Sequence, residues 1–534
     1  MTGKEDLGQA LEKLIRRGAG TVIITNGEQD GLVGSSGGLF PPTQSRAFKV
    51  HPRLGQILKT NPELFADTTG CGDNFLGGFL ASLAWQKSRG EQLNLDQALA
   101  WATSSGGFAC LYPGGLYQEP EPGEKRSQIL PLVNHYLGNH LVQWGAGNIG
   151  RSFIGQIFAR NGWQVTFVDV DSDLIHQLNQ AGGYKVIEVT DQSEQPIDIR
   201  GIRAIHGQDT DQVAQAVLHA TMISISVGKQ VLPKVLPDLA KHLAYRYDLR
   251  PDEPIDLLIS ENMTDGAEYV RSQLRQAMTT FERIDVPLDT YVGLIETSLG
   301  KMVPIQTSQD PLTLYAEPYN TLVVDRRGFL GPLPLIPQLK AVDSMKAWVV
   351  KKLYVHNLGH AAAAYLGYQA HPESTYLWEV LQDPLVKDRV RNAMDLGAQV
   401  VQRQFPGIFS TQELDDHIED LIIRFQNRAL GDTIYRVGRD VGRKLSWDDR
   451  IGGALLAAHR YGLGVDGLAQ VFLAALDFRA TDPVSGRLFP GDQELFDSLA
   501  DLPKSEQIQR VLGIPPGYDS STYQGLIQKL VQMA

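Results

Sequence analysis

Leu141-Val-Gln-Trp-Gly-Ala-Gly-Asn-Ile-Gly150 is the stretch that decides the fold class of this chain. It begins as a short apolar strand, continues as Gly-x-Gly-x-x-Gly, and is followed by a segment with the spacing of an amphipathic helix. In a dinucleotide-binding turn the first glycine makes the tight turn, the second lets the backbone approach a pyrophosphate, and the third lets helix pack on strand. The pyrophosphate then lies on unpaired N–H groups at the helix N-terminus. We therefore predict an α/β Rossmann-type domain whose cofactor turn contains Gly145, Ala146, Gly147, Asn148, Ile149 and Gly150.

A second predicted strand, residues 164–170, supports this interpretation. It carries Asp169 at about the distance from the glycines at which such folds place an acidic residue. A carboxylate there accepts from the ribose hydroxyls and repels a 2′-phosphate, so NAD is favoured over NADP. The alternative is a glycine-rich turn in some other α/β protein. A later strand, residues 221–227, leads to Gly228, and such a strand end lies over the cofactor, which adds Val227 and Gly228 to the expected site.

Composition excludes several classes of protein. The 534 residues suggest about three domains, and a hydrophobic content of 43 % is enough to build large cores. The net charge of -12 argues against a nucleic-acid partner or an anionic membrane surface. Two cysteines, Cys71 and Cys110, are too few for a disulfide framework or a thiolate metal cluster. The N-terminus lacks the apolar core of a signal peptide, and no apolar run is long enough to cross a bilayer, so we expect a cytoplasmic protein.

Residues 1–116 form a first unit, and their most informative stretch is Asp67-Thr-Thr-Gly-Cys-Gly-Asp73 at the start of a predicted helix. Gly70, Cys71 and Gly72 place backbone N–H groups where an anion can bind, with Asp73 beside them as a candidate base. This stretch resembles the C-terminal signature of the ribokinase-like sugar kinases. The resemblance implies a partial kinase segment, with ATP as a candidate partner, and it covers only the last part of such a kinase. Kinase activity, a nucleotide-sensing or assembly module and a vestigial appendage all remain open.

The rest of the chain divides by composition. Residues 118–126 contain two prolines, a glycine and five charged residues, which predicts a linker over 117–139, with a short helix near 127–137. Residues 140–325 are expected to form the Rossmann domain. Helical periodicity over 344–366, 385–404 and 412–430 then predicts an all-helical domain over 326–534. The expected fold is therefore a Rossmann-type doubly wound domain followed by an all-helical domain, preceded by a partial ribokinase-like α/β segment.

Lys351-Lys-Leu-Tyr-Val-His-Asn-Leu-Gly-His360 is the strongest candidate for catalysis. On a helix, Lys352, His356 and Asn357 lie close to one face, and His360 follows on the next turn. A lysine that is buried there has a lowered pKa, because burial disfavours its charged form. Spacing alone leaves open a solvated lysine beside a hydrogen-bonded asparagine.

From residue 140 onward the chain resembles the polyol-specific long-chain dehydrogenases, and among them the mannitol-1-phosphate 5-dehydrogenases. Four stretches carry the resemblance: residues 145–155, 261–263, 352–360 and 436–450. It implies that Lys352 is the general acid/base of an NAD-dependent hydride transfer. It also implies that Asn262 and Asn357 hold the reacting oxygen, and that His360 orients the substrate or the lysine. No metal is expected, although His356 and His360 have the spacing of a zinc-ligand pair, because the His-Glu-x-x-His pattern is lacking.

The expected reaction interconverts mannitol 1-phosphate and fructose 6-phosphate. A cationic run provides candidate ligands for the substrate phosphate: Arg436, Arg439, Arg443 and Lys444. The alternative is that these residues form ion pairs on the surface or between domains. Glu296 and Lys301 stand where the family usually has Asp and Arg, which leaves open a related reductase of fructuronate or tagaturonate.

Overall fold

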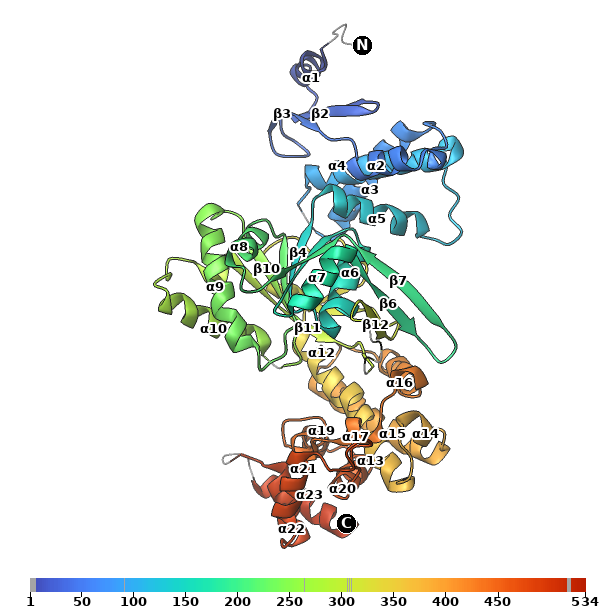
Figure 1. Ribbon diagram of the computed structural model, residues 1–534, viewed down its shortest axis with the longest axis vertical. Coiled ribbons are helices and arrows are strands. Elements are labelled where there is room, and N and C mark those ends of the chain that lie inside the picture. Colours follow the sequence, from blue (N-terminus) through green and yellow to red (C-terminus); the bar gives the residue numbers. More distant parts are fainter. Residues whose placement is uncertain are drawn as a thin grey trace.

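The computed structural model describes residues 6–90, 92–263, 265–304, 306, 308, 310–515 and 520–534. Three bodies follow one another along its long axis: the N-terminal segment, a domain built on a large sheet, and a helical domain that ends at the C-terminus (Figure 1). No helix among the described residues is long and apolar enough to cross a membrane.

The N-terminal segment combines a three-stranded antiparallel sheet, in the order β1-β2-β3, with a group of helices. Its α3 and α4 pack closely, since a Cβ at Gly78 would lie 2.6 Å from the carbonyl oxygen of Trp101. In chain order the elements are α1 (Leu7–Arg16), β1 (Thr21–Asn26), β2 (Gln29–Ser35), β3 (Thr43–Phe48), α2 (Pro52–Thr60), η1 (Pro62–Leu64), α3 (Cys71–Ser88), α4 (Leu95–Phe108), η2 (Ala109–Leu111) and η3 (Pro113–Gly115).

The segment expected as a linker contains a packed helix, α5 (Glu124–Tyr136). Asn134 on this helix is fully buried, and its Nδ2 donates to the carbonyl oxygens of Asn161, at 2.8 Å, and Leu335, at 2.9 Å. The proline- and charge-rich stretch therefore covers the approach to α5 and its first residues. The apolar side chains of α5 are buried against both neighbouring bodies: Ile129, Leu130, Leu132 and Val133. This part of the chain is therefore a packed helix and not a flexible linker.

The large sheet has eight strands in the order β14-β13-β11-β10-β9-β4-β5-β8. Strands β8, β5, β4, β9, β10 and β11 are neighbours in this order and are all parallel. This is the strand order of a doubly wound dinucleotide-binding fold, in which the direction of the chain across the sheet reverses between β4 and β9. Every residue of β4 and β10 is buried, because helices cover both faces. The strands are β4 (His140–Trp144), β5 (Gln164–Asp169), β8 (Ile202–His206), β9 (Met222–Ile225), β10 (Ile255–Ile259), β11 (Val292–Leu299), β13 (Leu322–Asp325) and β14 (Leu339–Val342).

Helices and a second small sheet complete this domain. The small sheet has the order β12-β6-β7 and extends from the side of the large one (Figure 1). Its strands are β6 (Gly183–Val189), β7 (Glu194–Arg200) and β12 (Thr313–Ala316). The helices are η4 (Gly150–Gly155), α6 (Gln156–Arg160), α7 (Ser172–Ala181), α8 (Thr210–Leu218), α9 (Leu232–Leu249), α10 (Gly266–Thr280), α11 (Leu288–Tyr291) and η5 (Arg326–Gly328).

The sheet continues beyond residue 326, where the sequence suggested that the helical domain begins. Strand β14 pairs in parallel with β13, so residues up to Val342 belong to the sheet. This edge strand has one fully buried residue, Val342, and its sequence therefore carries little strand signal.

The helical domain is built around one large apolar core. Its described helices are α12 (Met345–Lys351), η6 (Lys352–Asn357), α13 (Leu358–Ala370), α14 (Leu377–Val380), α15 (Pro384–Gln404), α16 (Thr411–Phe425), η7 (Arg428–Leu430), α17 (Ile434–Gly438), α18 (Val441–Leu445), α19 (Gly452–Arg460), α20 (Asp466–Leu476), α21 (Pro490–Leu499), α22 (Lys504–Leu512) and α23 (Ser520–Met533). The helices expected over 344–366, 385–404 and 412–430 correspond to α12–α13, α15 and α16 with η7.

Candidate active site

The glycine turn after β4 has the geometry of a dinucleotide site. Gly145 has φ +90°, and a Cβ there would lie 2.4 Å from the carbonyl oxygen of Ser226 on the neighbouring strand end. A Cβ at Gly150 would lie 2.0 Å from the carbonyl oxygen of Gly145, so only glycine lets the helix start this close to the strand. A Cβ at Gly147 would meet nothing within 4 Å, which leaves the backbone open to a ligand. These three glycines therefore fit the roles that a bound dinucleotide requires.

Asp169 lies at the end of β5, directly beside this turn. Its Oδ2 accepts from the backbone N–H of Ala146 at 2.6 Å, and its Oδ1 accepts from that of Val170 at 2.7 Å. Asn148 is exposed and Ile149 is half-buried at the start of η4, so the predicted turn presents backbone to the surface next to this carboxylate. The arrangement fits an adenosine ribose placed against Asp169.

Val227 and Gly228 follow β9, and both their N–H groups are already engaged. Each donates to Oε1 of Glu261 at 2.7 Å. Burial raises the pKa of Glu261, and these two hydrogen bonds oppose that rise. Glu261 therefore ties the end of β9 to the end of β10 and fixes the position of Asn262, the next residue. The sequence pointed to the Glu-Asn-Met stretch without assigning a role to its glutamate.

A cavity of about 320 Å³ lies between the sheet domain and the helical domain. It contains the four predicted catalytic residues, Asn262, Lys352, Asn357 and His360, although they come from two domains. The remaining lining residues are Leu299, Lys301, Met302, Val303, Pro304, His356, Leu430, Asp432 and Arg436.

Lys352 and Asn262 meet across this cavity. The Nζ of Lys352 donates to Oδ1 of Asn262 at 2.9 Å. Burial, with a further contribution from the positive charge of Arg450, lowers the pKa of Lys352 to about 8. An ammonium group with such a pKa exchanges its proton near neutral pH, as a general acid or base must.

The helix that carries Lys352 changes its winding at this residue. Residues Lys352–Asn357 form a π-helical stretch, η6, between α12 and α13. Such stretches are rare and are frequently found at functional sites. A Cβ at Gly397 of α15 would lie 1.8 Å from the carbonyl oxygen of Tyr354, so α15 packs directly on the backbone of η6. The two helices thereby hold Lys352 and Asn357 in place.

His360 is oriented by groups that the sequence did not single out. Its Nε2 lies 2.9 Å from Oδ2 of Asp432, and its ring stacks on Phe425, with centroids 4.9 Å apart. Burial alone would raise the pKa of Asp432, but its hydrogen bond to His360 and the charges of His360 and Arg436 lower it. Asp432 is therefore a carboxylate that fixes the imidazole. Its only sequence signal is its place shortly before the arginine-rich run.

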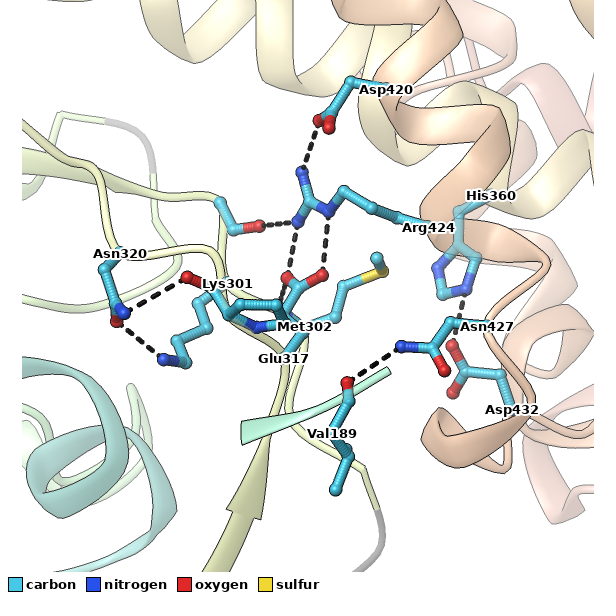
Figure 2. Close-up of polar contacts among 12 residues, drawn as sticks. Val189, Lys301, Met302, Glu317, Asn320, His360, Asp420, Arg424, Asn427 and Asp432 are labelled. Carbon is cyan, nitrogen blue, oxygen red and sulfur yellow. Dashed lines mark hydrogen bonds and ion pairs between the residues drawn. The ribbon is translucent and has the colours of Figure 1, made fainter. Parts of the chain in front are cut away.

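Figure 2 shows how the two walls of the cavity are joined. Arg424 of α16 reaches across the domain boundary. Its Nε donates to Oε2 of Glu317 at 2.8 Å, and its terminal nitrogen donates to the carbonyl oxygen of Gly300 at 2.6 Å. Glu317 also accepts from the backbone N–H of Met302, which lines the cavity. Arg424 precedes Phe425, so this ion pair links the wall at Met302 to the ring that supports His360.

Lys301 lies on the same wall and is buried. Its Nζ donates to Oδ1 of Asn320 at 2.7 Å, and Figure 2 shows that the ammonium group points away from His360. Burial lowers its pKa to about 8.

The cationic run divides between the cavity and structural contacts. Arg436 lines the cavity and forms an ion pair with Asp432. The other three do not line it. Arg439 stacks over Phe489, Arg443 pairs with Asp440 and Asp449, and the buried Lys444 donates to the backbone carbonyls of Val437 and Arg439.

The kinase-like turn is present in the N-terminal segment. Gly70, with φ +75°, precedes α3, and Cys71, Gly72 and Asp73 form the first turn of that helix. Asp73 lines a separate cavity of about 540 Å³, whereas the other three do not. Cys71 and Cys110 are free thiols with their Sγ atoms 3.4 Å apart. Across the described residues, no group of three or more His, Cys, Asp or Glu side chains is arranged to hold a metal ion.

Comparison with known proteins agrees with this architecture. Residues 139–338 match the mannitol dehydrogenase Rossmann domain, residues 344–531 match the mannitol dehydrogenase C-terminal domain, and residues 2–122 match the pfkB family of carbohydrate kinases. The mannitol-1-phosphate 5-dehydrogenase of Brevibacillus brevis is 30% identical over 380 residues, which cover 71% of this chain and 94% of that protein.

Two solved structures share the fold. The ternary complex of Pseudomonas fluorescens mannitol 2-dehydrogenase with NAD and D-mannitol has a TM-score of 0.54 at 16% identity and covers 74% of this chain and 94% of its own. A substrate-free D-sorbitol dehydrogenase has a TM-score of 0.56 at 13% identity and covers 74% of this chain and 95% of its own. With its Rossmann and C-terminal domains both matched, the chain belongs to the mannitol dehydrogenase family.

Proposed function

We propose that this chain is an NAD-dependent oxidoreductase that interconverts D-mannitol 1-phosphate and D-fructose 6-phosphate. The observation that carries the proposal is the contact between Lys352 and Asn262 in the interdomain cavity. The identity with the Brevibacillus brevis enzyme supports the choice of substrate.

The cofactor is NAD, held by the turn at Gly145, Gly147 and Gly150 and by Asp169. Bound in its reduced form, it supplies the hydride that reaches the substrate carbonyl carbon. Asp169 disfavours a 2′-phosphate at the ribose because the two negative charges repel each other.

The chain's own residues manage the proton and the developing charge. In the reductive direction the Nζ of Lys352 gives its proton to the carbonyl oxygen, and in the oxidative direction it takes the proton from the hydroxyl. The side-chain amides of Asn262 and Asn357 donate to this oxygen while it carries negative charge. His360, fixed by Asp432 and Phe425, orients a neighbouring hydroxyl of the substrate.

The charges of the cavity favour a phosphorylated substrate. Lys352 and Arg436 face a single carboxylate, Asp432, among the lining residues, whereas the ammonium group of Lys301 is turned toward Asn320. This excess of positive charge in a chain with a net charge of -12 attracts a phosphate ester more strongly than an uncharged polyol.

The proposal is tested by the oxidation of NADH with fructose 6-phosphate, fructose, fructuronate and tagaturonate as substrates. We expect the highest kcat/KM with fructose 6-phosphate. Lys352→Ala should abolish turnover and leave NADH binding intact, while the exposed Lys346 of α12 provides the control Lys346→Ala. A preference for a uronate would replace the proposed substrate, and an active Lys352→Ala variant would remove the lysine mechanism.

ATP binding by the N-terminal segment is a second candidate. It is supported by the cavity that Asp73 lines together with Asn74, Lys125 and Trp85. ATP consumption that depends on a sugar and is lost in Asp73→Ala would establish a kinase, and the absence of ATP binding would remove this function. The two free thiols support a cytoplasmic location, because disulfides are rare in that reducing compartment.

A further inference from the structure

A cleft of about 630 Å³ lies between the N-terminal segment and the sheet domain, away from both sites described above. One wall comes from α2 and α5, with Arg53 and His135. The other wall comes from α6, β7 and β8, with Arg160, Arg200 and Arg203. Figure 1 shows α5 lying along the sheet domain at this junction.

The charges in this cleft are strongly unbalanced. Four arginines line it, against one acidic residue, Asp198. Among the described residues, these four arginines form one ion pair, between Arg160 and Glu188, with the paired nitrogen and oxygen 4.0 Å apart. The two other arginines of the sheet domain use part of their hydrogen-bonding capacity on uncharged partners. Arg200 donates to a backbone carbonyl at 2.8 Å, and Arg203 donates to a threonine hydroxyl at 2.8 Å.

Several other arginines on the surface of this chain have carboxylate partners. Arg283 pairs with Asp248 at 2.7 Å and with Asp285 at 3.0 Å, and Arg271 and Arg275 share Asp289. The chain contains 61 acidic residues, so carboxylates are plentiful. Arg53, Arg160, Arg200 and Arg203 thus form a local excess of positive charge in a concave site, where low-dielectric walls concentrate the field.

We propose that this cleft binds a small phosphorylated molecule whose phosphate groups bridge Arg53 on one wall and the arginines of the sheet domain on the other. Guanidinium groups match phosphate oxygens in paired, charge-assisted hydrogen bonds. The volume of the cleft lies in the range of small-molecule sites. The cleft is separate from the cavity at Lys352, because the two share no lining residue.

The test is isothermal titration of the full chain with inorganic pyrophosphate, in the presence of saturating NADH so that the dinucleotide turn is filled. We expect saturable binding that weakens by at least about tenfold in Arg53→Ser and again in Arg203→Ser, since each variant loses charge-assisted hydrogen bonds. Arg283→Ser, which removes an arginine with two carboxylate partners outside the cleft, should bind as the unaltered chain does. Absence of binding, or equal affinity in both cleft variants and the control, would overturn the proposal.

A second measurement tests whether the ligand bridges the two bodies. Pyrophosphate should raise the temperature of thermal unfolding of the unaltered chain, and the rise should be much smaller in Arg53→Ser. Arg53 is exposed, so we expect Arg53→Ser to fold as the unaltered chain does. Titrations with ATP, a sugar bisphosphate and citrate separate the sources of the anion. Tighter binding of either phosphate ester than of citrate supports a phosphorylated ligand, and tighter binding of citrate contradicts it.

Discussion

Arg424→Met is the change with the largest expected effect on the interface between the sheet domain and the helical domain. The Glu317 side chain is 2% exposed and that of Arg424 is 11% exposed, so their ion pair is almost fully removed from water. Replacing Arg424 leaves the carboxylate of Glu317 buried with the backbone N–H of Met302 as its remaining hydrogen-bond donor among those described. Removing one partner of a buried ion pair costs about 3–5 kcal/mol. The remaining N–H contact places our expectation near the lower end, at about 3 kcal/mol.

The assay is urea unfolding followed by far-ultraviolet circular dichroism, which reports on the helices of all three bodies. With a slope of about 3 kcal/mol per molar urea, a loss of about 3 kcal/mol lowers the midpoint by roughly 1 M. The double variant Glu317→Gln/Arg424→Met replaces the buried charge by a neutral amide, and it should recover more than half of this loss. A midpoint within about 0.3 M of the unaltered chain for Arg424→Met would refute the reasoning. So would a double variant that is no more stable than the single one.

The same change tests whether the ion pair positions the active site. Because Arg424 connects Met302 to Phe425, which stacks on His360, we expect Arg424→Met to lower kcat and to leave NADH affinity nearly unchanged. Arg424→Lys keeps the charge but loses the paired geometry, so its kcat should lie between that of the unaltered chain and that of Arg424→Met.

Three further changes address the cofactor turn and the proton transfer. Since the pKa of Lys352 is lowered to about 8 and reduction needs its protonated form, kcat/KM for fructose 6-phosphate should fall above pH 8. The rate of mannitol 1-phosphate oxidation should rise over the same range, and rates that stay flat from about pH 7 to 9 would contradict the assignment. Gly150→Ala places a Cβ 2.0 Å from the carbonyl oxygen of Gly145, so NADH affinity measured by fluorescence should fall by at least about tenfold. Asp169→Ser removes the charge beside the ribose and should raise the use of NADPH relative to NADH; an unchanged ratio would show that Asp169 does not select the cofactor.

Several features were predictable because they depend on contacts between neighbours in the chain. The glycine turn after β4 follows from a positive φ and from the close approach of η4, which only glycine permits. The helices of the C-terminal domain follow from apolar periodicity, and the candidates Lys352, Asn357 and His360 lie in one short segment. Their meeting with Asn262 was implied by resemblance, and the geometry that joins them comes from the packing of two domains.

Other features had no local signal. Composition indicated a linker where α5 packs against both of its neighbours, because the charged stretch includes the first residues of α5, and the buried residues of this helix begin only at Ile129. The edge strand β14 depends on its pairing with β13, and no apolar run announces it. The arginine-rich run was one cluster in sequence, but the structure brings only Arg436 to the cavity, because the run is divided between α17 and α18 by a break at Asp440, which has φ +68°.

Resemblance to the polyol dehydrogenases made Lys352 the candidate for proton transfer. By itself, the sequence determined the Rossmann turn, the helical C-terminal domain and the kinase-like turn. These depend on backbone conformation and on spacing along the chain. Only the tertiary structure decided the contact of Lys352 with Asn262, the support of His360 by Asp432, the ion pair of Arg424 with Glu317 and the cluster of arginines between the first two bodies. Each of these joins residues far apart in sequence. The free energy that brings them together comes from the burial of the cores around them, so no short stretch of the chain contains it.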